Sequence, residues 1–126
     1  MSEKEREAVK RAVLDYVEGT YDVDPALTKR SVHPRLAKRG FVQEDGAYVE
    51  YPMTFEELVE AAKTFNRDGR IPQDAPKKVT IYEVLDQTAS AKLEAWWGID
   101  YLHLAKFNGE WKIVHVVWQT FPITGD

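Results

Sequence analysis

The dipeptide Asn108-Gly109 is the sequence feature that most limits how this chain can fold. Both residue types accept the positive φ angles of a two-residue hairpin turn, so the pair predicts two antiparallel strands that meet here. The turn also sets the register, because Phe107 then lies opposite Glu110 and pairing proceeds residue by residue away from it.

Regular pairing from this turn predicts which side chains share a face of the sheet. The expected cross-strand pairs are His103 with Val114, Tyr101 with Val116, and Ile99 with Trp118. A mainly apolar face with a few polar groups is typical of a pocket lining, so this face is predicted to line a pocket. The opposite face is predicted to serve plain packing, and it carries Leu102, Leu104, Trp111, Ile113, His115 and Val117. A register error of one residue would exchange the two roles.

Helical spacing dominates the first half of the chain. Apolar residues within 5–18 recur at helical intervals, and Gly19 is expected to end this helix. Asp24-Pro25 is a typical helix start, and that second helix should end near residues 32–33, because Pro34 disfavours a helical residue before it. Thr54 and Glu57 fit a capping box that opens a third helix, which Asp68-Gly69 would close.

Extended spacing takes over from Lys77 onward. Strands are predicted at residues 78–86, 90–95, 99–107 and 110–121, with a short strand at 48–51 before the third helix. Helices followed by a strand meander indicate an α+β fold with an antiparallel sheet. The length of 126 residues suits a single domain over 1–126. Because both faces of the last hairpin are apolar, we expect a homodimer that packs partly through the sheet.

Composition excludes several functional classes. A net charge of −4 argues against nucleic acid as a partner, and the absence of cysteine excludes disulfides, thiolate metal sites and cysteine nucleophiles. No apolar run reaches the ~18 residues of a membrane span, and the first residues lack a signal peptide's apolar core, so the expected location is the cytoplasm. Neither a cofactor nor a metal site is predicted. The basic run at 29–39 is read as a solvated turn balanced by the acidic residues of 56–60, with an anion site as the alternative.

Several motifs together resemble one known family. The runs Asp100-Tyr101-Leu102-His103-Leu104 and Asn108 to Val114 resemble the C-terminal signature of the putative lumazine-binding family, within the nuclear-transport-factor-2-like (cystatin-like) superfamily. The segments 33–39, 53–54 and 89–92 extend the resemblance over about residues 7–119. The resemblance implies a cone-shaped, curved antiparallel sheet wrapped around the N-terminal helices, with an internal pocket. The superfamily includes isomerases, dehydratases, cyclases and non-catalytic binding proteins, so the resemblance fixes no reaction.

The candidate site follows from these faces and from that superfamily plan, in which an acid or base on a strand meets a polar group from a helix. The residues expected to line it are Tyr16, Trp97, Tyr101, His103, Val116 and Trp118. The first hypothesis is a protein that binds a small, flat, largely apolar or aromatic molecule without converting it. The second is an isomerase, dehydratase or cyclase with His103 as acid/base and Tyr16 as hydrogen-bond donor. The third is an interaction module. Asp100 is expected on the face away from the pocket, and Asp15 is expected to point to solvent.

Overall fold

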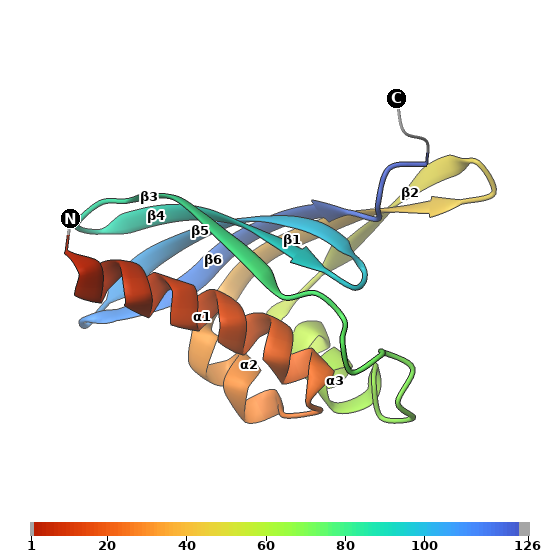
Figure 1. The fold of residues 1–126 in the computed structure, drawn as a ribbon, viewed down its shortest axis with the longest axis horizontal. Helices are drawn as coiled ribbons and strands as arrows, with labels where there is room; N and C mark the ends of the chain where they lie inside the picture. The colour runs from red at the N-terminus through yellow and green to blue at the C-terminus, as the bar shows by residue number, and fades with distance from the viewer. Residues whose placement is uncertain (1, 124–126) are drawn as a thin grey trace.

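The computed structural model describes residues 2–123, which form three helices and one six-stranded sheet (Figure 1). The elements in chain order are α1 (Glu3–Tyr21), α2 (Pro25–Ser31), β1 (Val32–Glu44), β2 (Ala47–Met53), α3 (Phe55–Thr64), β3 (Lys78–Val84), β4 (Thr88–Ala95), β5 (Gly98–Phe107) and β6 (Glu110–Gln119). This is the α+β architecture that the sequence predicts. None of the helices in residues 2–123 has the length and apolar character needed to cross a membrane.

Helix starts agree with the capping signals, whereas helix ends do not. The Asp24 side chain accepts a hydrogen bond from the Ala26 N–H at 3.2 Å, and both bonds of the Thr54–Glu57 capping box are present. However, α1 continues through Gly19 to Tyr21, and α3 ends at Thr64, well before Asp68-Gly69. Gly19 serves close packing instead, because a Cβ there would lie 2.3 Å from Oγ1 of Thr28 on α2.

The sheet contains a strand that the sequence reading missed. Its order is β2-β1-β6-β5-β4-β3, and β1 pairs with β6 in parallel while every other pair is antiparallel. The basic run at 29–39 was therefore wrongly read as a solvated turn, because most of it lies in β1. Its charges are balanced mainly by other acids than those of 56–60: Arg30 pairs with Asp15, and Arg39 pairs with Glu50.

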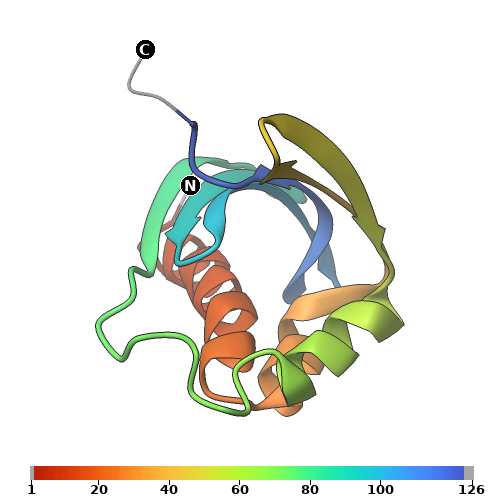
Figure 2. The same cartoon turned by 90° about the vertical axis from the view of Figure 1, so that its right-hand side faces the viewer.

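The sheet is curved and arches over the helices (Figure 2). Helix α1 packs under β3, β4 and β6, whereas α3 lies near β1 and α2. The core between the sheet and α1 is made of fully buried aliphatic residues: Val9, Val13, Val17, Leu93, Leu102, Leu104, Ile113 and Val116. Burial of this inner face stabilises the fold and leaves the outer face of the sheet uncovered within one chain.

The β5–β6 hairpin begins as predicted and then departs from regular pairing. Asn108 and Gly109 have φ values of 51° and 82°, and Phe107 lies opposite Glu110. Leu104 still pairs with Ile113, but the register then shifts, so that His103 lies opposite His115 and Val114 has no partner. This β-bulge is a single extra residue on β6.

The bulge makes the predicted pairs of His103, Tyr101 and Ile99 wrong. The observed pairs are His103 with His115, Leu102 with Val116, Tyr101 with Val117, Asp100 with Trp118 and Ile99 with Gln119. On β6 this shift turns Val116 and Trp118 to the inner face in place of His115 and Val117. Strand β5 alternates without interruption, so Asp100 lies on the inner face and Tyr101 and His103 lie on the outer face. The face of β5 that was predicted to line the pocket is therefore the outer one.

Candidate functional site

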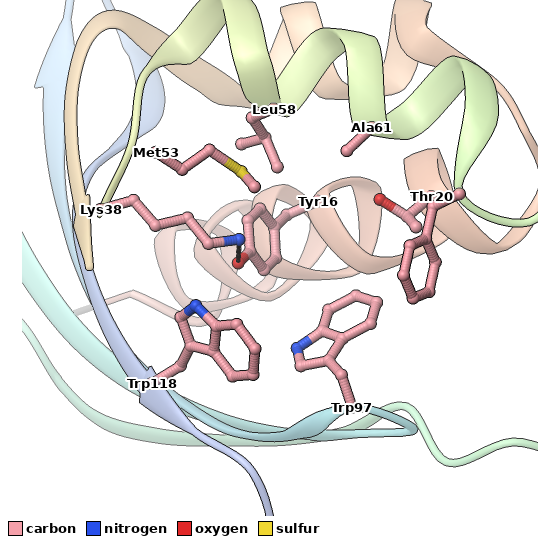
Figure 3. Close-up of a pocket in the computed structure, with 9 residues that line it drawn as sticks. Tyr16, Thr20, Lys38, Met53, Leu58, Ala61, Trp97 and Trp118 are labelled. Atoms are coloured by element: carbon pink, nitrogen blue, oxygen red, sulfur yellow. Dashed lines mark hydrogen bonds between the residues drawn. The ribbon is translucent and has the colours of Figure 1, made fainter. Parts of the chain in front are cut away.

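A pocket opens between the inner face of the sheet and the helices α1 and α3 (Figure 3). Its volume is about 100 Å³, and its lining is almost entirely apolar or aromatic. The lining residues are Tyr16, Thr20, Lys38, Met53, Leu58, Ala61, Phe65, Trp97 and Trp118. Since an apolar cavity of about 150 Å³ can hold a benzene molecule, this pocket has the scale of a small ring compound.

A buried tyrosine and a buried aspartate meet behind the pocket. Tyr16 Oη on α1 donates a hydrogen bond to Oδ2 of Asp100 on β5 at 2.6 Å. The indole Nε1 of Trp97 donates to the other carboxylate oxygen, Oδ1, at 2.9 Å. Asp100 is 0% exposed and Tyr16 is 1% exposed. Each oxygen of a fully buried carboxyl is thus satisfied, as a buried polar group requires.

Lys38 extends this chain of hydrogen bonds into the pocket. Its Nζ donates to Tyr16 Oη at 2.7 Å, so the phenol accepts from Lys38 while it donates to Asp100. Figure 3 shows the end of the Lys38 side chain beside the Tyr16 hydroxyl, facing the Trp118 indole. The same Nζ lies 4.9 Å from the centre of the Tyr16 ring and 5.8 Å from that of Trp118. Both rings contribute cation–π stabilisation when the lysine is protonated.

Burial shifts the titration of all three groups in this chain. Burial raises the pKa of Asp100 above its ordinary value of 3.8, although nearby Lys38 and the hydrogen bonds to the carboxyl offset part of the rise. Burial lowers the pKa of Lys38 below 10.5, with a partial offset from Asp100. Burial and the neighbouring Asp100 charge raise the pKa of Tyr16 well above 10. Burial thus favours the neutral form of each group.

The position of Trp118 depends on the glycine beside it. Gly40 on β1 is the cross-strand neighbour of Trp118, and a Cβ at Gly40 would lie 2.3 Å from Nε1 of the indole. The indole can therefore lie across the β1 backbone only because residue 40 has no side chain. Trp97 also lines the pocket. Its ring meets the Tyr16 ring edge-on, with 6.4 Å between the two ring centres.

The structure brings together only part of the predicted site. Tyr16, Trp97 and Trp118 all line the pocket. Val116 is fully buried in the core but does not line the pocket. Tyr101 is 48% exposed on the outer face, and His103 is also exposed there.

The predicted pairing of His103 with Tyr16 as catalytic partners is wrong, because Leu102 and Leu104 of β5 face the core and the histidine between them faces outward. His103 instead lies beside His115, with 3.3 Å between the two Nδ1 atoms. His115 was expected on the packing face, and it too is exposed. Among residues 2–123 no group of three or more His, Cys, Asp or Glu side chains is placed to hold a metal ion.

Two acids also lie where the sequence reading did not place them. Asp100 was expected on the face away from the pocket, but it reaches Tyr16 from the inner face. Asp15 was expected in solvent, but it is 3% exposed, and the guanidinium groups of Arg11 and Arg30 bind it. Lys38, Asp100 and Gly40 are the site residues that sequence reasoning missed. Lys38 and Gly40 were missed because β1 lacks an apolar alternation, and Asp100 was missed because both faces of the β5–β6 hairpin are apolar.

Comparisons with known proteins agree with this architecture. The family model described as putative lumazine-binding matches residues 4–119, and the chain belongs to this family. A search of curated proteins found no significant match.

Solved structures share the fold at low sequence identity. A nuclear-transport-factor-2-like protein of unknown function from Shewanella baltica is 18% identical, with a TM-score of 0.73, and the match covers 97% of this chain and 98% of that chain. A similar protein of unknown function from Silicibacter pomeroyi is 18% identical, with a TM-score of 0.69 and coverage of 95% and 99%. A protein with a cystatin-like fold from Novosphingobium aromaticivorans is 12% identical, with a TM-score of 0.64 and coverage of 97% and 85%. The chain therefore has the nuclear-transport-factor-2-like fold.

Proposed function

We propose that this member of the putative lumazine-binding family binds a small, flat, largely apolar molecule in the pocket that Trp97 and Trp118 line. The family description suggests a small-molecule ligand, and the aromatic lining suits a planar ring. A few polar groups in a mainly apolar pocket are the usual composition of a ligand site. An interaction module would need no such pocket, so the pocket favours the ligand hypothesis.

The observation that carries this proposal is the position of Lys38 Nζ, a hydrogen-bond donor, at the wall of a mainly apolar pocket. One of its hydrogens is used on Tyr16 Oη, which leaves the others for a ligand. The Trp118 indole also presents a donor on the same side (Figure 3). Because Lys38 and Trp118 are donors, the ligand is expected to place an acceptor, such as a carbonyl oxygen, against Lys38. Its ring is expected to lie between the two indoles on one side and Met53 and Leu58 on the other (Figure 3).

Thermal unfolding against a panel of pteridines, flavins, steroids, aromatic polyketides and short-chain acids tests the proposal. A ligand at about one hundred times its dissociation constant adds roughly 2.7 kcal/mol of stability. That gain raises the melting temperature of a domain of this size by several degrees. Trp118→Ala should abolish the shift, whereas Tyr101→Ala, an aromatic loss on the outer face of the same hairpin, should leave it intact. Equal loss in both variants would contradict the proposal.

A second candidate function is supported by the Tyr16–Asp100 hydrogen bond. A strand acid that meets a helix tyrosine matches the plan of the catalytic superfamily members, with Asp100 in the place first given to His103. Such a pair could move a proton next to a carbonyl group, as an isomerase, dehydratase or cyclase requires. Deuterium uptake from D2O next to the carbonyl of a bound ketone, followed by NMR, should be faster with wild type than with Asp100→Asn. Equal rates would rule this function out.

Homodimer formation through the outer face of the sheet is also part of the proposal. Its support is a shallow apolar groove whose outer-face residues are Phe41, Tyr48, Tyr101, Val117 and Gln119. Exposed aromatic and aliphatic residues that gather in one place are typical of an interface. Sedimentation equilibrium should give a dimer for wild type and a monomer for Val117→Glu, while Gln87→Glu in the β3–β4 turn should remain dimeric. If the wild-type protein is a monomer, the dimer proposal is refuted and the ligand-binding proposal is unaffected.

A further inference from the structure

We propose that Lys38 is a reactive amine that condenses with small aldehydes or ketones in the pocket, which makes carbonyl compounds the ligand class of this site. The inference rests on the proposed function, because the carbonyl compound would occupy the same pocket. It goes further, because it assigns a covalent step to one side chain.

Lys38 lies at the wall of the pocket, and its surroundings differ from those of the lysines that form ion pairs. Lys77, Lys78, Lys106 and Lys112 are of that second kind, each with Nζ within 4.0 Å of a carboxylate oxygen. Among residues 2–123 no carboxylate lies within that distance of Lys38 Nζ, whose partner is the Tyr16 hydroxyl at 2.7 Å. A contacting carboxylate would hold the lysine in its ammonium form, which has no lone pair for attack. Lys38 has only a phenol there, and aromatic rings around it.

The charge balance of the buried chain also favours an amine. Burial lowers the pKa of Lys38 and raises the pKa of Asp100, so both shifts favour transfer of one proton from the lysine to the carboxyl. Tyr16 Oη contacts both groups and can relay that proton, at 2.7 Å from Nζ and 2.6 Å from Oδ2. Lys38 itself is half-buried, with its amine at the pocket wall. A lysine whose pKa is lowered in an apolar pocket is a recognised nucleophile towards carbonyl carbon.

The condensation balances with groups already present. The Nζ lone pair forms a C–N bond to the carbonyl carbon, the C–O π bond breaks, and a proton from nitrogen passes to the oxygen. The C–O bond of the resulting carbinolamine then breaks, and the oxygen leaves as water with a second proton from nitrogen. The Tyr16 hydroxyl is placed to carry each proton between nitrogen and oxygen. The product is an imine between Lys38 and the former carbonyl carbon, and no oxidant or reductant takes part.

The walls of the pocket select the shape of the carbonyl compound. Trp97 and Trp118 lie on one side of the Lys38 amine, with Met53 and Leu58 on the other (Figure 3). The volume of about 100 Å³ limits the compound to a single small ring. Benzaldehyde is therefore the probe, and benzyl alcohol has the same ring without the carbonyl group.

Reductive trapping tests the inference on the wild-type protein. The protein is incubated at pH 7 with benzaldehyde and cyanoborohydride, which reduces an imine to a stable amine, and the labelled lysine is located by peptide mass mapping. We expect one benzyl group per chain, at Lys38. Labelling should be lost in Lys38→Arg and in Lys38→Met, and retained in Lys63→Arg, which alters an exposed lysine of α3. Label spread over the surface lysines, or none at Lys38, would overturn the inference.

Two further measurements separate this inference from the binding proposal. Benzyl alcohol should quench tryptophan fluorescence in wild type whether or not an imine can form. Quenching without label at Lys38 would overturn the imine and leave the binding proposal standing, whereas absence of both would refute both for this ligand class. Tyr16→Phe should slow labelling at least several-fold while benzyl alcohol still binds, because the proton relay is lost. Labelling at an unchanged rate would refute the role of Tyr16.

Discussion

The phenol oxygen of Tyr16 and a carboxylate oxygen of Asp100 lie 2.6 Å apart in the interior, although the residues are 84 positions apart in the sequence. The contact joins the first helix to the fifth strand at the base of the pocket. A β-bulge at Val114 of β6 places Trp118 on the same inner face as Asp100. The position of one wall of the pocket therefore depends on one irregularity in one hairpin.

Removal of the Tyr16 hydroxyl should weaken the fold. In Tyr16→Phe the buried Oδ2 of Asp100 loses its donor, and an unsatisfied buried group costs about 1–3 kcal/mol. Urea unfolding should show this loss against wild type. Tyr82→Phe is the matched control, because Tyr82 is 54% exposed and its change should stay within about 0.5 kcal/mol. Similar stabilities for the two variants would contradict the buried hydrogen bond.

The pH dependence of the free energy of unfolding should reveal the raised pKa of Asp100. Since its pKa is raised in the folded state, the folded protein holds a proton that the unfolded chain has lost at pH values between 3.8 and the folded pKa. The contribution of this group to stability is therefore fully present below pH 3.8 and is lost as the pH rises through the folded pKa. The stability of wild type relative to Asp100→Asn should fall as the pH rises across this window. A difference that rises with pH would mean a lowered pKa and would refute the assignment.

A methyl group at residue 40 should close the site. In Gly40→Ala the new Cβ would overlap the Trp118 indole, and overpacking of this kind costs about 1–3 kcal/mol. The indole must move, so ligand-induced stabilisation should be lost as well. The cost should shrink in the double variant Gly40→Ala with Trp118→Ala, where the clash is absent. Equal costs in both backgrounds would show that the indole does not lie over Gly40.

Deletion of the unpaired residue of β6 should be tolerated better than deletion of a paired residue. Deletion of Val114 removes the unpaired residue and leaves Val116 and Trp118 on the inner face, so the protein should still fold and keep its pocket. Deletion of Val117 instead turns Trp118 to the outer face, and ligand-induced stabilisation should disappear. Thermal unfolding of both variants with and without ligand measures this. Loss of ligand-induced stabilisation on deletion of Val114 but not of Val117 would contradict the register of β5 and β6.

More of the fold than of the candidate site could be predicted from the sequence. Local signals such as the Asn108-Gly109 turn and the Thr54–Glu57 capping box act over a few residues, and the structure confirms both. The bulge at Val114 is set by tertiary packing, because either face of β6 could have been buried. Strand β1 was missed because its inward residues include Lys38 and Gly40, which do not follow an apolar alternation.

The candidate site inherits those two errors. Tyr16 lies on the apolar face of a helix whose period can be read directly, so its burial could be predicted. The acid that it meets could not, because both faces of the β5–β6 hairpin are apolar and the sequence does not show which face covers the helices. Leu102 and Leu104 face the core, so Asp100 faces inward and Tyr101 and His103 face outward. Only the inward position of Trp118 follows from the bulge.

The most direct test of the central claim is an NMR titration that follows the indole N–H signals of the four tryptophans as benzyl alcohol is added. We predict that the signals of Trp97 and Trp118, which line the pocket, shift with a common saturation curve. Those of Trp96 and Trp111, which do not line it, should move far less. Unmoved indole signals of Trp97 and Trp118, or shifts confined to Trp96 and Trp111, would contradict the account.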